Sequence, residues 1–186
     1  MIGLFRRARS MSRRAHAVSQ LEEALPIRSV IVLCTANRVR SPFAEAILAR
    51  VLPNEVSVIS RGVLAGGEPC PLEAVGAARD FQVDLSTFVS TRLSPHELVR
   101  SGVVLAMEQR MVSELSGRFP SVGSRVLLLG DFDPVPGSAR DVFDPYLMPV
   151  TEHRIAYDRI ARCCSAVAHV LGAHTPSSFN THEKFV

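Results

Sequence analysis

Aromatic residues are scarce in this chain, which has no tryptophan and only two tyrosines among 186 residues. Few side chains are therefore available to stack on nucleic-acid bases. Long apolar runs are also absent, since no segment reaches the roughly 18 apolar residues needed to span a bilayer. Charge of one sign is in small excess, with a net charge of +3. These absences argue against an integral membrane segment and give no support for a nucleic-acid partner.

Cysteine is sparse as well, with four in the chain. Cys163 and Cys164 are adjacent within a helical pattern, which is poor geometry for a disulfide. This is not the pattern of a secreted protein held together by disulfides. The histidines are scattered and join no cluster of cysteines or carboxylates, so no metal site is predicted. We expect the protein to work in the reducing environment of the cytoplasm.

The two ends of the chain differ in composition from the middle. Residues 1–28 are basic, but no apolar stretch follows the arginines, as a signal peptide would require. We predict a flexible extension there, disordered or helical. The alternative is a peripheral contact with anionic lipid or with an acidic partner. Residues 173–186 are predicted to be a polar tail, which leaves a single domain over residues 29–172.

Short apolar segments alternate with helical patterns in this domain. The expected strands are residues 30–33, 56–60, 103–107 and 125–129. The expected helices are residues 42–51, 72–81, a short helix from Ser94, 109–116 and 152–171. This alternation predicts an α/β fold with a parallel sheet and right-handed crossovers. In such sheets a ligand binds at the carboxyl ends of the strands.

The most informative segment is the turn after the first strand. Cys34 ends the apolar run, Arg40 and Ser41 follow, and Pro42 opens a helical pattern. The loop between Cys34 and Arg40 consists of Thr35, Ala36, Asn37, Arg38 and Val39. Backbone N–H groups in a loop at a helix N-terminus form a ready site for a phosphate. The planar fork of Arg40 matches two phosphate oxygens better than a lysine would.

Cys34 is the candidate nucleophile of this loop. Facing such donors, it is expected to be a thiolate near neutral pH and to attack phosphorus in line. Ser41 is expected to cap the helix at Pro42, and its hydroxyl could stabilise the thiolate. Asn37 tolerates the positive φ that so tight a loop demands. The competing interpretation is a buried free cysteine that packs as a small apolar residue.

A phosphate ester also needs a proton for its leaving group, and general acid catalysis typically contributes 10²–10⁴-fold. Asp144, in the sequence Asp144-Pro145-Tyr146, is the candidate acid in a long irregular segment. Tyr146 could form one wall of a slot for an aromatic ring. Asp133, which also precedes a proline, and Asp141 remain alternatives that the residues alone do not exclude.

Residues 30–46 resemble the signature of the low-molecular-weight protein tyrosine phosphatases, and residues 144–146 resemble their general-acid loop. Residues 60–63, 105–110 and 126–130 are similar to further family segments, nearest to the bacterial branch associated with exopolysaccharide and capsule export. The resemblance covers about residues 29–172. It implies a four-stranded, parallel, twisted sheet flanked by helices on both faces, with no metal and no cofactor.

The resemblance also implies roles for the site residues. Cys34 would be the nucleophile, Arg40 the phosphate clamp, and Asp144 the acid and then the base. Ser60 would support Asn37, and Ser41 would tune the thiol. The substrate would be a phosphotyrosine protein, in the bacterial branch a tyrosine autokinase that regulates polysaccharide assembly. We expect the protein to act as a monomer.

Several residues depart from the family pattern. Ala36 stands where the family usually has glycine, so its Cβ is expected to strain the loop or crowd a phosphate oxygen. Val39 replaces a second cysteine that many members carry, which leaves Cys34 without a neighbouring disulfide partner. Arg38 adds a charge where an apolar residue is common, and Leu147 replaces a second aromatic residue.

Three other functions compete with a phosphotyrosine phosphatase. A slow or non-catalytic phosphate-binding module on the same fold would be one consequence of Ala36. An arsenate reductase would need two further cysteines near residues 92–101, and that stretch has none. Within the enzyme class, the substrate could instead be phosphoarginine or a small aryl phosphate.

Overall fold

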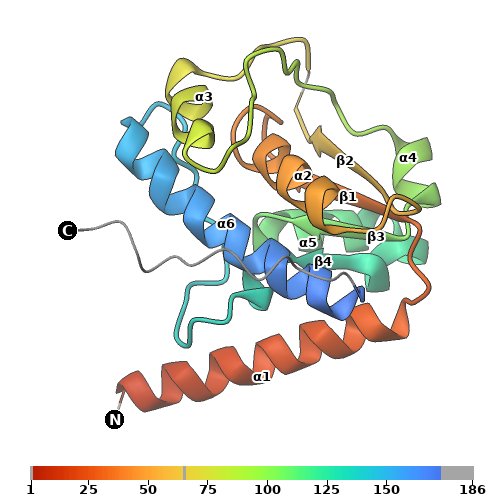
Figure 1. Ribbon diagram of the computed structural model, residues 1–186. Coiled ribbons are helices and arrows are strands. Elements are labelled where there is room, and N and C mark those ends of the chain that lie inside the picture. Colours follow the sequence, from red (N-terminus) through yellow and green to blue (C-terminus); the bar gives the residue numbers. More distant parts are fainter. Residues whose placement is uncertain (1, 65, 173–186) are drawn as a thin grey trace.

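The computed structural model describes residues 2–64 and 66–172, which form one parallel sheet with helices on both faces (Figure 1). Its strands are β1 Ser29–Cys34, β2 Ser57–Gly62, β3 Val103–Ala106 and β4 Val126–Leu128. They pair in the order β2-β1-β3-β4, and every pair is parallel. The predicted α/β fold with four parallel strands is confirmed. The predicted polar tail, residues 173–186, lies outside the described residues.

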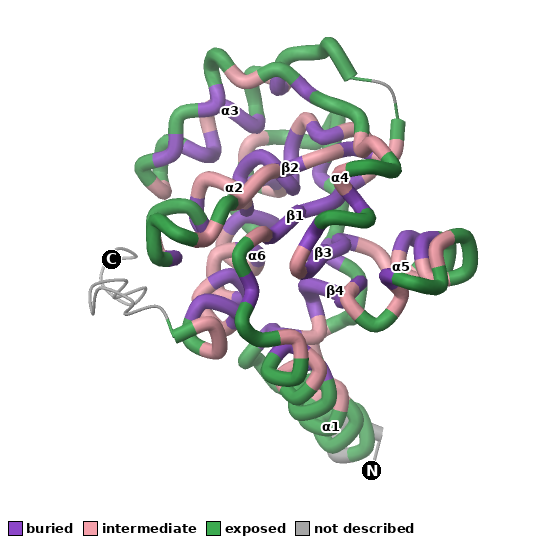
Figure 2. The backbone as a smooth tube through the Cα atoms, turned by 90° about the vertical axis from the view of Figure 1, so that its right-hand side faces the viewer, coloured by how far each residue is buried: buried purple, intermediate pink, exposed green. Residues whose placement is uncertain are grey.

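The α-helices are α1 Ile2–Glu23, α2 Arg40–Val51, α3 Leu72–Arg79, α4 Pro95–Arg100, α5 Gln109–Arg118 and α6 Val150–Val170. Two 3₁₀ turns, η1 Pro120–Arg125 and η2 Leu129–Phe132, flank β4. Successive side chains of a strand point to opposite faces of the sheet. Val30 and Val32 therefore enter the core under α2, α3 and α6, and Ile31 and Leu33 enter the core under α4 and α5. Figure 2 shows these buried strands between the two helical layers.

The strand order places the functional segment. The chain runs from β1 outward to β2 and then crosses back to β3 on the other side of β1. Helices leave the two sides of β1 in opposite directions at such a switch point, and a ligand can enter there. Cys34 is the last residue of β1. The predicted position of Cys34 at the carboxyl end of the first strand is confirmed, and the strand order places this strand in the interior of the sheet.

The helix starts show one correct and one wrong prediction. Ser94 caps α4 through a capping box with Glu97, whose N–H lies 3.2 Å from the Ser94 hydroxyl. Ser41 was expected to cap a helix at Pro42, and this is wrong. Helix α2 already begins at Arg40, so Ser41 lies inside its first turn, and no side chain caps this end. The Ser41 hydroxyl contacts the Cys34 thiol instead.

Helix α1 occupies most of the basic extension, for which the sequence left disorder and helix both open. It runs along the outside of the domain beside η2 and α6 (Figure 1). Ala17 and Leu21 on its second half are buried and belong to the core under α6. No helix in the described residues is long and apolar enough to cross a membrane.

Candidate active site

The loop after β1 folds back over the thiol of Cys34. The backbone N–H of Asn37 donates to the Cys34 sulfur at 3.2 Å, and the Ser41 hydroxyl lies 3.0 Å from the same sulfur. Asn37 has a φ of 54°, as predicted for this tight turn. Cys34 and Asn37 are both buried. The loop thus places the sulfur against one backbone N–H and one hydroxyl group at the start of a helix.

The side chain of Asn37 fixes the shape of this loop. Its amide nitrogen donates to the hydroxyls of Ser41 at 2.9 Å and Ser60 at 2.8 Å, and its oxygen accepts the N–H of Thr91 at 2.7 Å. Ser60 in turn donates to Glu45 at 2.5 Å. The expected contact between Ser60 and Asn37 is present. Glu45 and Thr91 were not anticipated, and only the place of Glu45 in the family-like segment pointed to it.

Arg40 is almost fully buried beside the loop, although its side chain is charged. Its Nη1 donates to the carbonyl oxygen of Val142 at 3.0 Å, and its Nη2 pairs with Glu108 at 3.0 Å and with Asp144. Its Nε is also buried and has no hydrogen-bond partner among the described residues. Buried donors are nearly always satisfied, so an open Nε marks a place for an acceptor.

Glu108, which follows β3, is a site residue that the sequence analysis missed. It accepts the hydroxyl of Thr35 at 3.1 Å and pairs with Arg110 at 2.6 Å, besides its contact with Arg40. Burial alone would raise the pKa of Glu108, but the hydrogen bond from Arg110 and the charge of Arg40 lower it below its usual value. Glu108 is therefore an anion that neutralises part of the Arg40 charge. The similarity of residues 105–110 to the family was the only signal for it.

The structure separates the three aspartates that the sequence proposed as acids. Asp144 reaches the loop, where it contacts Arg40, and its side chain is 40% exposed. Asp141 instead accepts the first backbone N–H of α5 at 2.8 Å. Asp133 is buried and paired with Arg159 at 2.9 Å, and it makes no contact with the loop residues 34–41 among the described residues. Of the three, Asp144 alone contacts Arg40 in the described residues.

The rim of the site is formed by Arg38 and Tyr146. The guanidinium of Arg38 lies 5.4 Å from the centroid of the Tyr146 ring, and its Nη1 donates to the Tyr146 hydroxyl at 3.2 Å. Its Nε donates to the carbonyl oxygen of Pro69 at 2.8 Å. Arg38 thus joins the loop after β2 to the segment that carries Asp144. Leu147 beside this pair is 85% exposed.

Ala36 does not require the backbone freedom of a glycine. Among the described residues, the non-glycine residues with positive φ are Asn37, Gln82 and Leu147. The glycine that the loop does need is Gly62 at the end of β2. A Cβ built on Gly62 would lie 3.0 Å from backbone atoms of both Ala36 and Asn37. The close approach of β2 to the loop therefore depends on this missing side chain.

The remaining cysteines differ from Cys34 in their surroundings. Burial raises the pKa of Cys70 to about 11 and that of Cys163 to about 12, and it raises the pKa of Cys164 as well. These three thiols are therefore protonated at neutral pH. The described part of the chain contains no group of three or more histidine, cysteine or carboxylate side chains that could hold a metal ion.

Comparison with known proteins agrees with this geometry. Residues 29–176 match the family described as low molecular weight phosphotyrosine protein phosphatase. The probable low molecular weight protein-tyrosine-phosphatase EpsP of Ralstonia nicotianae is 31% identical over 137 residues, which cover 73% of this chain and 90% of that protein.

Two solved structures have the same fold over most of the chain. The tyrosine phosphatase amsI of Erwinia amylovora superposes with a TM-score of 0.71 at 25% identity, covering 78% of this chain and 93% of that one. The YwlE arginine phosphatase of Geobacillus stearothermophilus gives 0.70 at 28% identity, covering 79% and 94%. The resemblance inferred from the sequence is confirmed, and the chain is a phosphatase that belongs to the low molecular weight phosphotyrosine protein phosphatase family.

Proposed function

We propose that this phosphatase hydrolyses phosphotyrosine through a cysteinyl-phosphate intermediate on Cys34. The observation that carries the proposal is the convergence of Cys34, Arg40 and Asp144 on one loop, with a buried and unpartnered Nε on Arg40. An unsatisfied buried donor costs about 1–3 kcal/mol. A phosphate oxygen would remove that cost, because guanidinium groups bind oxyanions through paired N–H groups.

In the first step the Cys34 thiolate attacks phosphorus, and the bond from phosphorus to the tyrosyl oxygen breaks. The N–H of Asn37 and the hydroxyl of Ser41, both in contact with the sulfur, stabilise its negative charge. Backbone N–H groups of the loop and the Arg40 fork hold the phosphoryl oxygens, whose charge is spread in the transition state. Asp144 gives its proton to the departing oxygen.

In the second step the Asp144 carboxylate takes a proton from water, and this water attacks the cysteinyl-phosphate. The bond from phosphorus to sulfur breaks, which releases inorganic phosphate and restores the Cys34 thiolate. In the structure Asp144 contacts Arg40. We propose that the arriving phosphoryl group replaces Asp144 at Arg40, so that the carboxyl group turns toward the leaving oxygen.

The proposed substrate is a tyrosine-phosphorylated protein. Tyr146 is 41% exposed at the rim and would pack against the substrate ring. The relatives include EpsP, and the sequence resembles the exopolysaccharide branch, which supports a bacterial tyrosine autokinase of polysaccharide assembly as the partner. The protein would act on it as a cytoplasmic monomer.

Phosphoarginine is the second candidate substrate, because the fold and 28% of the aligned residues are shared with the YwlE arginine phosphatase. The charge at the rim opposes it. The guanidinium of Arg38 lies beside Tyr146, where the substrate side chain would enter. A second guanidinium there would be repelled, and a neutral tyrosyl ring would stack instead.

The test is steady-state hydrolysis of three peptides, which carry phosphotyrosine, phosphoserine or phosphoarginine, under reducing conditions. Cys34→Ser is the control, because it keeps the loop but exchanges the nucleophile for a much weaker one. We expect turnover of the phosphotyrosine peptide and none in the variant. If the phosphoarginine peptide is hydrolysed faster than the phosphotyrosine peptide, phosphoarginine is the better assignment of the substrate. Turnover that survives in Cys34→Ser would contradict the cysteinyl-phosphate.

A further inference from the structure

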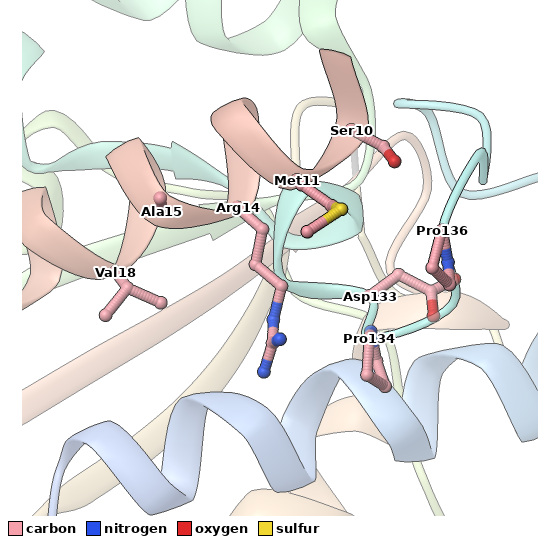
Figure 3. Close-up of a pocket in the computed structure, with 8 residues that line it drawn as sticks. All are labelled: Ser10, Met11, Arg14, Ala15, Val18, Asp133, Pro134 and Pro136. Atoms are coloured by element: carbon pink, nitrogen blue, oxygen red, sulfur yellow. The ribbon is translucent and has the colours of Figure 1, made fainter. Parts of the chain in front are cut away.

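Helix α1 precedes the family-matched residues and covers the segment that leads from η2 toward Asp144. Figure 3 shows Ser10, Met11 and Arg14 of α1 opposite Pro134 and Pro136, with the side chain of Arg14 directed toward the helix below. A cavity of about 340 Å³ lies between the two sides. Open space therefore remains along part of the contact between α1 and this segment.

Polar contacts from the same part of α1 hold the two sides together. The Ser10 hydroxyl accepts the N–H of Gly137 at 2.8 Å, and Arg13 donates to the carbonyl oxygen of Ser138 at 3.4 Å. Arg13 also lies 3.5 Å from Asp131. These contacts bring the N-terminal half of α1 against the turn at residues 137–140.

A second cavity, of about 400 Å³, opens beside these contacts. Four of the seven residues that line it are arginines, and the others are small. The lining consists of Arg6, Arg9, Arg13, Gly137, Ser138, Ala139 and Arg140. Positions three and four apart share one face of a helix. The three arginines of α1 therefore point toward the same side, where the fourth arginine faces them from the turn.

The positive charge around this cavity is only partly balanced by the protein. Arg13 and Arg140 both pair with Asp131, at 3.5 Å and 2.5 Å, and the charge of Asp141 also acts on Arg140. The side chains of Arg6 and Arg9 make no hydrogen bond or ion pair with the described residues. The Nε of Arg13 is buried and makes no hydrogen bond, although it lies 3.5 Å from Asp131. Like charges around one cavity repel one another. An anion bound between them would be attracted by each arginine, which offsets this repulsion.

The spacing of the arginines limits the kind of anion. Arg6 and Arg13 are seven residues apart, about 10 Å along the helix axis at 1.5 Å per residue. One phosphoryl group is too small to reach both ends. A chain or array of phosphoryl groups offers several acceptor oxygens and a high charge density, which suits a row of guanidinium forks.

We propose that Arg6, Arg9, Arg13 and Arg140 form a binding site for an anion with several phosphoryl groups, separate from the Cys34 loop. Such an anion joins α1 to the turn at residues 137–140. Two sources share this chemistry: a soluble polyphosphate chain and a layer of phospholipid headgroups.

Binding of tripolyphosphate, measured by titration calorimetry on the full chain with excess inorganic phosphate to fill the Cys34 loop, tests the soluble source. Co-sedimentation with phosphatidylcholine vesicles, with and without phosphatidylglycerol, tests the headgroups. The variant Arg6→Gln/Arg9→Gln removes two guanidinium groups but keeps residues of similar helix propensity. The matched control, Arg79→Gln/Arg100→Gln, removes the same charge from two exposed arginines elsewhere.

We expect the Arg6→Gln/Arg9→Gln variant to bind tripolyphosphate or the anionic vesicles at least tenfold more weakly, with the control unchanged. Loss of tripolyphosphate binding identifies a soluble ligand, and loss of vesicle binding alone identifies headgroups. Hydrolysis of a small aryl phosphate should be equal in all three proteins. Binding of neither probe would overturn the proposal, as would equal weakening in the control, which would mean a response to overall charge only.

Discussion

Replacing Gly62 with alanine should disturb the Cys34 loop without touching a group that reacts. The new Cβ would lie 3.0 Å from backbone atoms of Ala36 and Asn37, so either β2 or the loop must move away by a few tenths of an ångström. Strand β2 cannot retreat easily. Gly62 donates its N–H to Thr91 and accepts the N–H of Leu93, both at 2.8 Å. The loop is therefore the part that moves.

The size of the effect follows from that displacement. A misplacement of about 1 Å at a reacting group can cost about 100-fold in rate, so a few tenths of an ångström should lower kcat about fivefold. Overpacking of a close contact costs about 1–3 kcal/mol of stability. Both effects act through Asn37, whose N–H donates to the Cys34 sulfur.

The assay is single-turnover hydrolysis of a phosphotyrosine peptide together with thermal unfolding, for Gly62→Ala and for Gly76→Ala. Gly76 lies inside α3, and a Cβ there meets nothing within 4 Å. The control should keep full activity and gain about 0.5–1 kcal/mol from its helix propensity. Wild-type rate and stability in Gly62→Ala would refute the role assigned to this contact.

Three further predictions concern single side chains. Asp144→Asn should lower kcat by about 10²–10⁴-fold for phosphotyrosine but much less for an aryl phosphate with a good leaving group, because only the former needs a proton; equal losses would contradict the acid role. Arg40→Lys should fail to restore activity although the charge is kept, since the fork is lost, and near-normal kcat/KM would contradict two-point binding. Asp133→Asn should leave kcat unchanged and cost about 3–5 kcal/mol of stability, because it leaves Arg159 and Arg162 without their buried carboxylate. Burial would raise the pKa of Asp133, but the N–H of Val135 and the hydrogen bond from Arg159 hold it below its usual value. This stabilisation is therefore full well above about pH 4 and is lost as the pH falls below that; denaturant unfolding from pH 7 to pH 3 measures it.

The local features of the site could be predicted from the sequence because they depend on neighbouring residues. A strand that ends at Cys34 and a helix that follows at once place the loop, and Asn37 is a residue type suited to its positive φ. The fold class followed in the same way from the alternation of strands and helices. The prediction for Ser41 was wrong because its hydroxyl contacts the Cys34 thiol and the Asn37 side-chain amide instead of capping the end of the helix.

The contacts that the sequence did not reveal join residues far apart in the chain. Glu108 reaches Arg40 from the end of β3, and Thr91 reaches Asn37 from an irregular segment. Neither residue type is unusual enough to attract notice by itself. Geometry distinguishes Asp144 from Asp133 only once the path of the segment after η2 is known, and this irregular segment has no periodic pattern from which its path could be predicted.

The residues that form the site are far apart in the chain, and this affects when the site can form during synthesis. Arg40 and Asp144 are 104 residues apart. Tyr157, whose hydroxyl donates to the carbonyl oxygen of Val39 at 3.2 Å, is 118 residues from Val39. Cys34 and its loop therefore leave the ribosome well before the residues of α6 that hold them in place. Contacts so distant in sequence form late and slowly. Phosphatase activity would accordingly report on completion of the whole fold, and a nascent chain would carry an exposed thiol before it could catalyse anything.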